Sequence, residues 1–227
     1  MKKNTLCIIP SRSGSSGVKN KNIAKINNKP LIINAIHFAK KLNFIRKIIV
    51  STDSKYYKKI CETYNFKVGK LRPKKLSSKY VKTIDVIKYE LSNLSNKERA
   101  KIDNILLLQP NCPFRKIRDF QKANISLKKG YDTVVTIRKV NDYPSQMLVS
   151  KKKNLLKQFI NSKDPFMPRQ KLPSIFIRAG SMYFFKITNI NKYNSILGKK
   201  IYGIKVEDKY SLNIDNKVDM FLAKNFY

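Results

Sequence analysis

The chain has 227 residues, of which 42% are hydrophobic and 11% aromatic, enough apolar material to bury the core of one domain. Its formal net charge of +35 first suggests a nucleic-acid partner, because clustered cations bind phosphate by releasing counterions. The lysines are instead scattered through every segment, without an arginine-rich arm or an aromatic RNP-like strand. We therefore expect a solvated basic surface that attracts small anions, and no specific nucleic-acid binding.

The amino terminus and the cysteines exclude two further classes. The apolar run behind the basic start ends at Ile9 and Pro10, too short for the hydrophobic region of a signal peptide or for a membrane span. Cys7, Cys61 and Cys112 are far apart and form no C-x-x-C pair, so neither a disulfide framework nor a zinc site is predicted. We expect a cytoplasmic protein without membrane insertion.

Apolar runs and helical periodicity alternate along the chain. Strands are predicted over 5–9, 45–50, 105–108, 132–137, 181–185 and 201–206. Helices are predicted around 31–42, 57–61, 84–94, 117–127 and 218–222. The last helix has an apolar face made of Val218, Phe221 and Leu222. The alternation predicts a three-layer α/β fold, a mostly parallel sheet with helices on both faces and ligands beyond the carboxyl ends of its strands.

The rhythm of strands and helices breaks between residues 138 and 177. This segment contains four prolines and the polar run 151–154. Such composition indicates an excursion from the sheet, a hairpin-like arm inserted into a single domain that spans 1–227. Arms of this kind often pair with a second subunit, so a dimerisation role is expected.

The first strand runs into a loop rich in small residues and cations, IIPSRSGSSGVKNKN, which spans residues 8–22. Successive backbone N–H groups in a Gly/Ser turn form a nest for phosphate oxygens, and Arg12 and Lys21 supply charge from either end. The loop is neither a Walker A sequence nor G-x-G-x-x-G, so the nucleotide folds that use those motifs are not indicated. Its place at the ligand-binding edge predicts a phosphate site.

This loop resembles the amino-terminal signature of the sugar-activating cytidylyltransferases, specifically the CMP-sialic acid synthetase (acylneuraminate cytidylyltransferase) group. Other stretches resemble the family's motifs in the same order: Ser51-Thr52-Asp53, Leu71-Arg72-Pro73 with Leu76 and Asp85, LQPNCPFR at 108–115, Arg169-Gln170, Arg178, Gly180 to Tyr183, and SLNID at 211–215 with Asp219. The resemblance spans nearly the whole chain and implies a Rossmann-like nucleotidyltransferase fold.

The resemblance also implies a reaction and a set of site residues. CTP and a free nine-carbon α-keto acid sugar would give the CMP-sugar and pyrophosphate, by in-line attack of the anomeric hydroxyl on the α-phosphorus. The implied nucleotide-binding residues are the amides of Ser13, Gly14 and Ser15, the cations Arg12 and Lys21, and Asn22 and Arg72, with Arg72 at the cytosine. Gln109 would contact the sugar, Arg169 its carboxylate, and Arg178 the site of a neighbouring subunit in a homodimer.

A Mg²⁺ ion is implied at Asp215 and Asn213, with Arg12, Lys21 and Asp215 as the catalytic groups. Asp219 is either a further ligand or a carboxylate that suits the first turn of the last helix. The sequence departs from the family at four positions, which carry Ser16, Lys79, Gln146 and Asn213. Legionaminic acid or another bacterial nonulosonic acid is therefore as well supported as sialic acid.

Two other functions stay open from the sequence. One is a nucleotidyltransferase that acts on a phosphorylated alcohol. The other is a catalytically weak relative that binds CTP or another anion, which Ser16 and Asn213 suggest because each replaces a charged residue. Cys112 lies within the LQPNCPFR stretch, but a buried small residue is expected there rather than a nucleophile.

Overall fold

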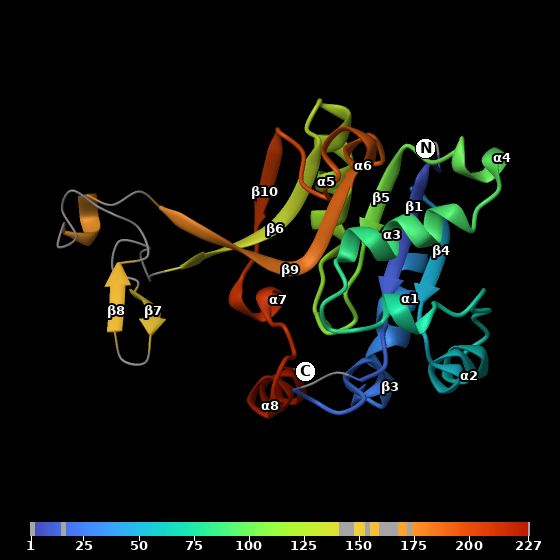
Figure 1. Cartoon of the computed structure of the whole chain (residues 1–227), viewed down its shortest axis with the longest axis horizontal. Helices are drawn as coiled ribbons and strands as arrows, with labels where there is room; N and C mark the ends of the chain where they lie inside the picture. Colours follow the sequence, from blue (N-terminus) through green and yellow to red (C-terminus); the bar gives the residue numbers. More distant parts are fainter. Residues whose placement is uncertain are drawn as a thin grey trace.

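The computed structural model describes residues 3–14, 17–140, 148–152, 155–158, 168–171 and 174–226. Its centre is a six-stranded sheet of order β10-β6-β9-β5-β1-β4 (Figure 1). The strands are β1 (Thr5–Pro10), β4 (Ile45–Ser51), β5 (Asn104–Leu107), β6 (Thr133–Val140), β9 (Ile175–Lys186) and β10 (Ile201–Lys205). All ladders are parallel except those of β9, which runs antiparallel to β5 and β6. The predicted mostly parallel α/β sheet is confirmed.

Helices cover both faces of this sheet. The α-helices in the described part of the chain are α1 (Leu31–Lys40), α2 (Lys55–Thr63), α3 (Thr83–Ser92), α4 (Asn96–Arg99), α5 (Ile117–Lys128), α6 (Thr188–Tyr193), α7 (Asp208–Ser211) and α8 (Lys217–Asn225). Side chains of a strand point alternately to its two faces. Cys7 and Ile9 accordingly pack in one core with α1 and α5, whereas Leu6 and Ile8 pack in another with α3 and α6. The alternation makes the sheet the middle of three layers.

Shorter elements complete the chain and were not predicted. A small hairpin joins β2 (Lys25–Ile26) to β3 (Lys29–Pro30), and 3-10 turns occur at η1 (Lys21–Ile23), η2 (Lys74–Leu76) and η4 (Arg169–Lys171). The α4, α6 and α7 helices span no more than six residues each, too few to show a clear helical period. No helix within the described ranges is both long and apolar enough to cross a membrane.

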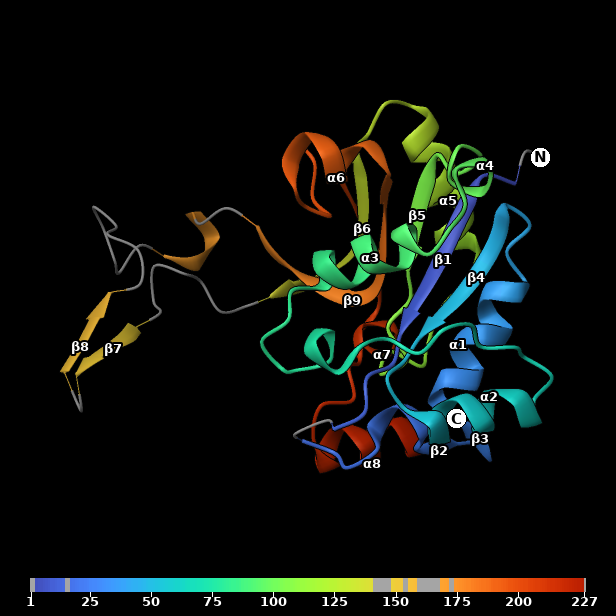
Figure 2. The ribbon, with the colours of Figure 1, turned by 45° about the vertical axis from the view of Figure 1, so that its right-hand side comes forward.

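The predicted arm begins as an extension of two sheet strands. The β6–β9 ladder continues to the pair Val140 and Ile175, a few residues beyond the boundaries expected at 138 and 177. Further out, β7 (Leu148–Lys152) pairs antiparallel with β8 (Leu155–Gln158) in a separate two-stranded sheet. Both views show this hairpin well away from the main body (Figures 1 and 2).

The apolar face expected on the last helix is wrong. Val218 and Phe221 are 65% and 66% exposed, and Leu222 is 39% exposed. The helix instead meets the body through Ala223, which packs in a small third core around Ile214. The partly buried Met220 packs against the same core, whereas the bulky triad is turned toward solvent.

Candidate active site

The loop after β1 folds back on itself at the carboxyl edge of the sheet. Gly14 has a φ of 71°, a left-handed conformation that favours glycine. Its carbonyl accepts a hydrogen bond of 2.8 Å from the guanidinium of Arg12. The backbone carbonyl of Arg12 in turn accepts from the Asn22 side-chain amide at 3.0 Å. Arg12 is therefore held at both its main chain and its side chain.

Ser13 is tied to the next strand. Its backbone N–H and its hydroxyl donate to the carboxylate of Asp53, at 2.8 and 2.6 Å, just beyond the end of β4. Burial opposes ionisation of Asp53, but the hydrogen bonds from Ser13 outweigh it and hold the pKa of the carboxyl below its usual value. The Ser13 amide, expected to face phosphate, is thus engaged by a carboxylate. Ser15 and Ser16 lie outside the described residues.

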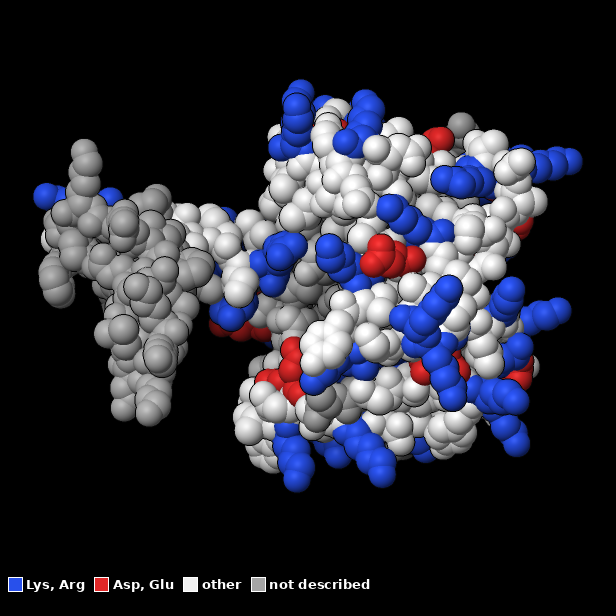
Figure 3. All heavy atoms as spheres, viewed as in Figure 1, with Lys and Arg blue, Asp and Glu red and all other residues white. Residues whose placement is uncertain are grey.

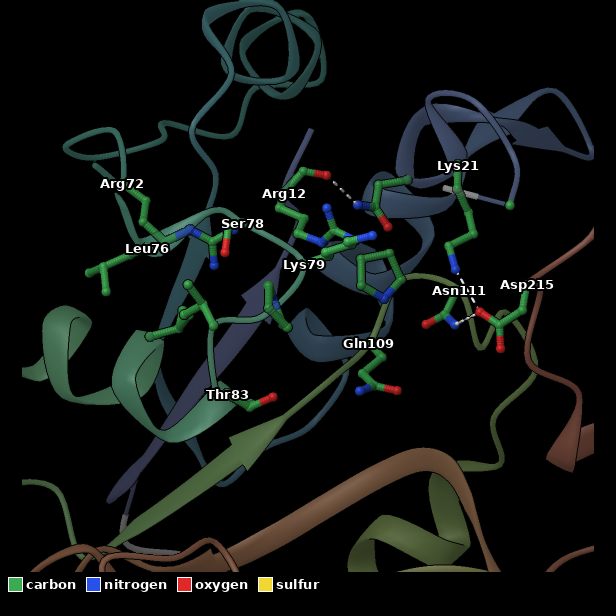
Figure 4. A pocket seen from close by; sticks show the side chains of 16 residues that line it. Arg12, Lys21, Arg72, Leu76, Ser78, Lys79, Thr83, Gln109, Asn111 and Asp215 are labelled. Atoms are coloured by element: carbon green, nitrogen blue, oxygen red, sulfur yellow. Dashed lines mark hydrogen bonds and ion pairs between the residues drawn. The ribbon is translucent and has the colours of Figure 1, made fainter. Parts of the chain in front are cut away.

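The segment before α8 closes against the loop. A Cβ on Gly17 would lie 1.9 Å from the backbone oxygen of Asp215, so only glycine fits this approach. The Asp215 carboxylate accepts from the Lys21 ammonium at 2.7 Å and from the Asn111 amide at 3.3 Å (Figure 4). The side chain of Asp215 remains 65% exposed. The predicted pair Lys21 and Asp215 is brought together.

Asp219 holds this segment rather than facing the loop. Its carboxylate accepts from the backbone N–H of Asp215 at 2.8 Å and of Asn216 at 3.0 Å. The Asn216 side chain accepts from the Asp219 N–H, which completes a capping box at the start of α8. Of the two roles considered for Asp219, the geometry supports the helix terminus.

Asn213 has partners other than those of Asp215. Its amide nitrogen donates to the Ala179 carbonyl at 3.2 Å, and its oxygen accepts from the Cys112 thiol at 2.6 Å. Gly180, with a φ of 78°, leaves the space that this side chain fills. Burial raises the pKa of the Cys112 thiol to about 12, so Cys112 is the inert small residue that the sequence predicted.

Arg72 is nearly buried, at 4% exposure, on the opposite side of the loop. Its backbone N–H donates to Thr52 at 2.7 Å, and its guanidinium donates to the Ser77 hydroxyl at 3.2 Å. Burial lowers the pKa of Arg72, while the negative charges of Asp53 and Glu90 oppose that shift. Burial likewise raises the pKa of Glu90, which is 5% exposed. Arg72 is a cation set among carboxylates.

These residues surround a cavity of about 490 Å³. Six of the predicted site residues line it: Arg12, Lys21, Asn22, Arg72, Gln109 and Asp215. Figure 4 shows Arg72, Leu76 and Ser78 at one end, and Lys21, Asn111 and Asp215 at the other. Arg12, Lys21 and Asn22 come after β1, and Gln109 comes after β5. The carboxyl ends of these parallel strands and of the neighbouring β4 meet at this edge of the sheet.

Further residues line the cavity without having been assigned a role: Pro10, Gly17, Leu76, Ser78, Lys79, Val81, Thr83, Val86, Pro110 and Asn111. Five of them belong to quoted motifs, namely Pro10, Gly17, Leu76, Pro110 and Asn111. The other five lie between residues 78 and 86, where only proximity to a motif could have drawn attention to them. Arg178 does not line the cavity. It is exposed on β9, with its guanidinium 5.9 Å from the centre of the Tyr183 ring. Arg169 belongs to η4, and nothing is described of its side chain.

The cavity is suited to a polyanion. Arg12, Lys21, Arg72 and Lys79 bring four cationic side chains to its lining, against the single carboxylate of Asp215. The volume lies within the range of about 300–1,000 Å³ typical of small-molecule sites. No cluster of three or more His, Cys, Asp or Glu side chains able to hold a metal occurs within the described ranges. Elsewhere cations are spread over the visible face (Figure 3).

Several known proteins are similar to this chain in sequence. A protein of Campylobacter coli named post-translational flagellin modification protein B is 28% identical over 221 residues, covering 96% of this chain and 93% of its own. The N-acylneuraminate cytidylyltransferase of Escherichia coli is 36% identical over 65% of this chain. The chain spans 34% of that relative and about half of a Streptococcus agalactiae protein of the same name, 51%, at 27% identity.

The fold also occurs in solved structures. CMP:2-keto-3-deoxy-manno-octonic acid synthetase, complexed with CTP, superposes with a TM-score of 0.68 at 14% identity, covering 98% of this chain and 99% of that one. The nucleotidyltransferase-like fold is thereby confirmed. The family profile described as cytidylyltransferase matches residues 6–225, nearly the full chain. The chain belongs to the cytidylyltransferase family, as its ordered motifs predicted.

Proposed function

We propose that this protein activates a nonulosonic acid as its CMP derivative, for the synthesis of a surface polysaccharide or another glycan. The anomeric hydroxyl of the sugar attacks the α-phosphorus of CTP and releases its proton to the solvent. The bond from the α-phosphorus to the bridging oxygen breaks, and pyrophosphate leaves with the electrons of that bond. Names of relatives support this substrate class, because they include N-acylneuraminate cytidylyltransferases and CMP-N,N'-diacetyllegionaminic acid synthases. The observation that carries the proposal is the convergence of Arg12, Lys21, Arg72 and Gln109 on one cavity.

The nucleotide would lie along this cavity with its two ends recognised separately. Buried Arg72 is a suitable donor to the cytosine carbonyl and ring nitrogen, because its fixed guanidinium can form two parallel hydrogen bonds. Arg12 and Lys21 would contact the triphosphate at the other end and neutralise the charge that develops on the leaving pyrophosphate. Asn22, besides holding Arg12, lines the same wall, and the amides of Gly14 and Ser15 complete the proposed phosphate contacts.

The sugar would occupy the side of the cavity beyond β5. Gln109 follows that strand, and its amide is proposed to contact the sugar. Arg169 is proposed to bind the sugar carboxylate. Arg178, exposed on β9 near the base of the arm, is proposed to reach the site of a second subunit in a homodimer. The hairpin β7–β8 is proposed to form the contact between the two subunits.

The family implies a magnesium ion, and the side chains fit it only in part. The exposed carboxylate of Asp215 suits Mg²⁺, which prefers carboxylate oxygen and bound phosphates. The amide oxygen of Asn213 does not fit, since it accepts from Cys112 and packs against Gly180. When bound, the ion would supply charge neutralisation on the triphosphate, with Asp215 as the protein ligand. We propose that CTP brings this ion with it, in the cytoplasm where both are available.

A pyrophosphate-release assay tests the proposal. The protein is incubated with Mg²⁺, CTP or UTP, and a panel of acceptors: sialic acid, legionaminic acid, pseudaminic acid and a phosphorylated alcohol. We expect release with CTP and one free nonulosonic acid. Release only with the phosphorylated alcohol would instead support a different nucleotidyltransferase, and CTP binding without any release would support a catalytically weak relative.

A further inference from the structure

Asp53 lies behind the cavity and touches the loop that forms one of its walls. The Ser13 amide and hydroxyl both donate to its carboxylate, at 2.8 and 2.6 Å. Two charge-assisted hydrogen bonds to one residue fix both the main chain and the side chain of that residue. Asp53 therefore anchors the loop at the position that directly follows Arg12.

The anchor determines where Arg12 can lie. Its carbonyl is fixed by Asn22 at 3.0 Å and its guanidinium by the carbonyl of Gly14 at 2.8 Å. With Ser13 held between them, three consecutive residues of the loop have defined partners. Without the Asp53 contacts, Ser13 would be free to rotate, and the positions of Arg12 and Gly14 would no longer be fixed relative to one another.

The segment that carries Asp53 also contacts Arg72, at the other end of the cavity. The backbone N–H of Arg72 donates to Thr52, the residue next to Asp53, at 2.7 Å. The charge of Asp53 acts favourably on the guanidinium of Arg72, which is largely shielded from water. The short segment 52–53 thus connects the wall carrying Arg12 with the wall carrying Arg72.

We propose that Asp53 is a positioning residue for the nucleotide, which fixes Arg12 and Arg72 relative to one another without contacting the substrate itself. The inference rests on the proposed function, because it assigns these arginines to the two ends of CTP. A carboxylate here also prevents phosphate from reaching the Ser13 amide. Phosphate contacts made by backbone amides are thereby confined to the part of the loop beyond Ser13, while the Arg12 side chain still reaches the phosphates.

Two substitutions separate the charge from the hydrogen bonds. Asp53→Asn keeps the size of the side chain and one acceptor for the Ser13 N–H, but it removes the charge. Ser13→Ala removes only the hydroxyl. Asp103→Asn is a matched control, since Asp103 accepts from the Asn4 amide at 2.6 Å at the opposite edge of the sheet, where β1 and β5 begin.

Steady-state kinetics and hydrogen exchange are measured for all variants. Loss of a hydrogen bond to a charged group typically costs a factor of about ten or more. We therefore expect Asp53→Asn to raise the KM for CTP about tenfold, leave the KM for the sugar near wild type, and speed amide exchange in segment 10–14. The double variant, Asp53→Asn with Ser13→Ala, should have a KM for CTP no higher than that of Asp53→Asn alone. Both substitutions weaken the same contact between Ser13 and Asp53, so their effects should not add. Asp103→Asn should match the wild type.

The outcomes distinguish this inference from the proposed function. If wild-type protein does not use CTP with any acceptor, the proposed function fails, whereas exchange in segment 10–14 still reports whether Asp53 orders the loop. An unchanged KM for CTP in an active Asp53→Asn variant would overturn the inference. A second result would also overturn it: a lower kcat with an unchanged KM for CTP, in proportion to a loss of thermal stability. That result would indicate that Asp53 only stabilises the fold.

Discussion

Replacing Arg72 with methionine should make the stability of the fold depend on pH in a new way. Arg72 and Glu90 are both nearly buried, at 4% and 5% exposure. Breaking a buried pair in direct contact costs about 3–5 kcal/mol. We expect a smaller loss here, about 2 kcal/mol at pH 8, because no ion pair joins Arg72 to Glu90 in the described part of the chain and the two side chains interact through charge alone. Asp53 keeps its Ser13 hydrogen bonds, so the uncompensated charge is that of Glu90.

The loss should shrink as the pH falls. Burial already raises the pKa of Glu90, and Ser51 and Arg72 counteract this rise. Without Arg72 the pKa in the folded protein moves further above the unfolded value. A group with a raised folded pKa destabilises the fold as the pH rises through that value and imposes no penalty below the unfolded pKa. The difference between variant and wild type is therefore largest near pH 8 and smallest near pH 5.

The chain has no tryptophan, so denaturant unfolding is best followed by far-UV circular dichroism. Free energies of unfolding are compared between pH 5 and pH 8 for the wild type, for Arg72→Met, and for Arg72→Met with Glu90→Gln. The second change should flatten the pH dependence, because glutamine cannot ionise. An equal loss at both pH values, or a pH dependence that survives Glu90→Gln, would refute the assigned interaction.

Three further predictions concern the cavity and the core. Arg12→Ala should reduce pyrophosphate release about 100-fold or more while leaving the unfolding midpoint unchanged, and full activity would contradict the role given to the loop. Asp215→Asn should slow release but change the free energy of unfolding by less than about 1 kcal/mol, as measured by denaturation, because the carboxylate that pairs with Lys21 is 65% exposed. Leu106→Ala should lower the free energy of unfolding by about 2–5 kcal/mol, whereas Phe221→Ser should change it by no more than about 0.5 kcal/mol. Similar losses of stability in the two variants would contradict the exposures of these side chains, 0% and 66%.

The parts of the fold that sequence reasoning predicted are those where burial leaves a continuous pattern. The run at 105–108 is apolar throughout because β5 lies between β1 and β9 and is covered on both faces. The antiparallel direction of β9 could not be predicted in this way, since an apolar strand can pair either parallel or antiparallel to its neighbours. The face of α8 was misplaced for a related reason: Val218 and Phe221 have helical spacing, but tertiary contact through Ala223 sets the orientation.

The same distinction applies to the site. Motifs placed Arg12 and Gln109 beside one cavity because each follows a parallel strand, and the carboxyl ends of β1 and β5 meet at this edge. Arg72 lies beyond α2 and returns to the same edge, where its backbone N–H donates to Thr52. The hydrogen bonds between residues around this cavity were not predictable in this way. Ser13 and Asp53 are 40 positions apart, and Cys112 and Asn213 are 101 apart. Both contacts depend on loop conformations that local sequence does not determine.

The few carboxylates of this chain explain how a lysine-rich protein can build a specific anion site. The sequence has 49 lysines and arginines but only 14 aspartates and glutamates, so most cations are left to the solvent. Asp53, Glu90 and Asp215 nevertheless all lie at this one edge, facing Ser13, Arg72 and Lys21. An anion is attracted to the whole surface through its general charge. At this edge, carboxylates also hold Arg72 and Lys21 in fixed positions beside one cavity, and fixed positions are what discriminate one polyanion from another.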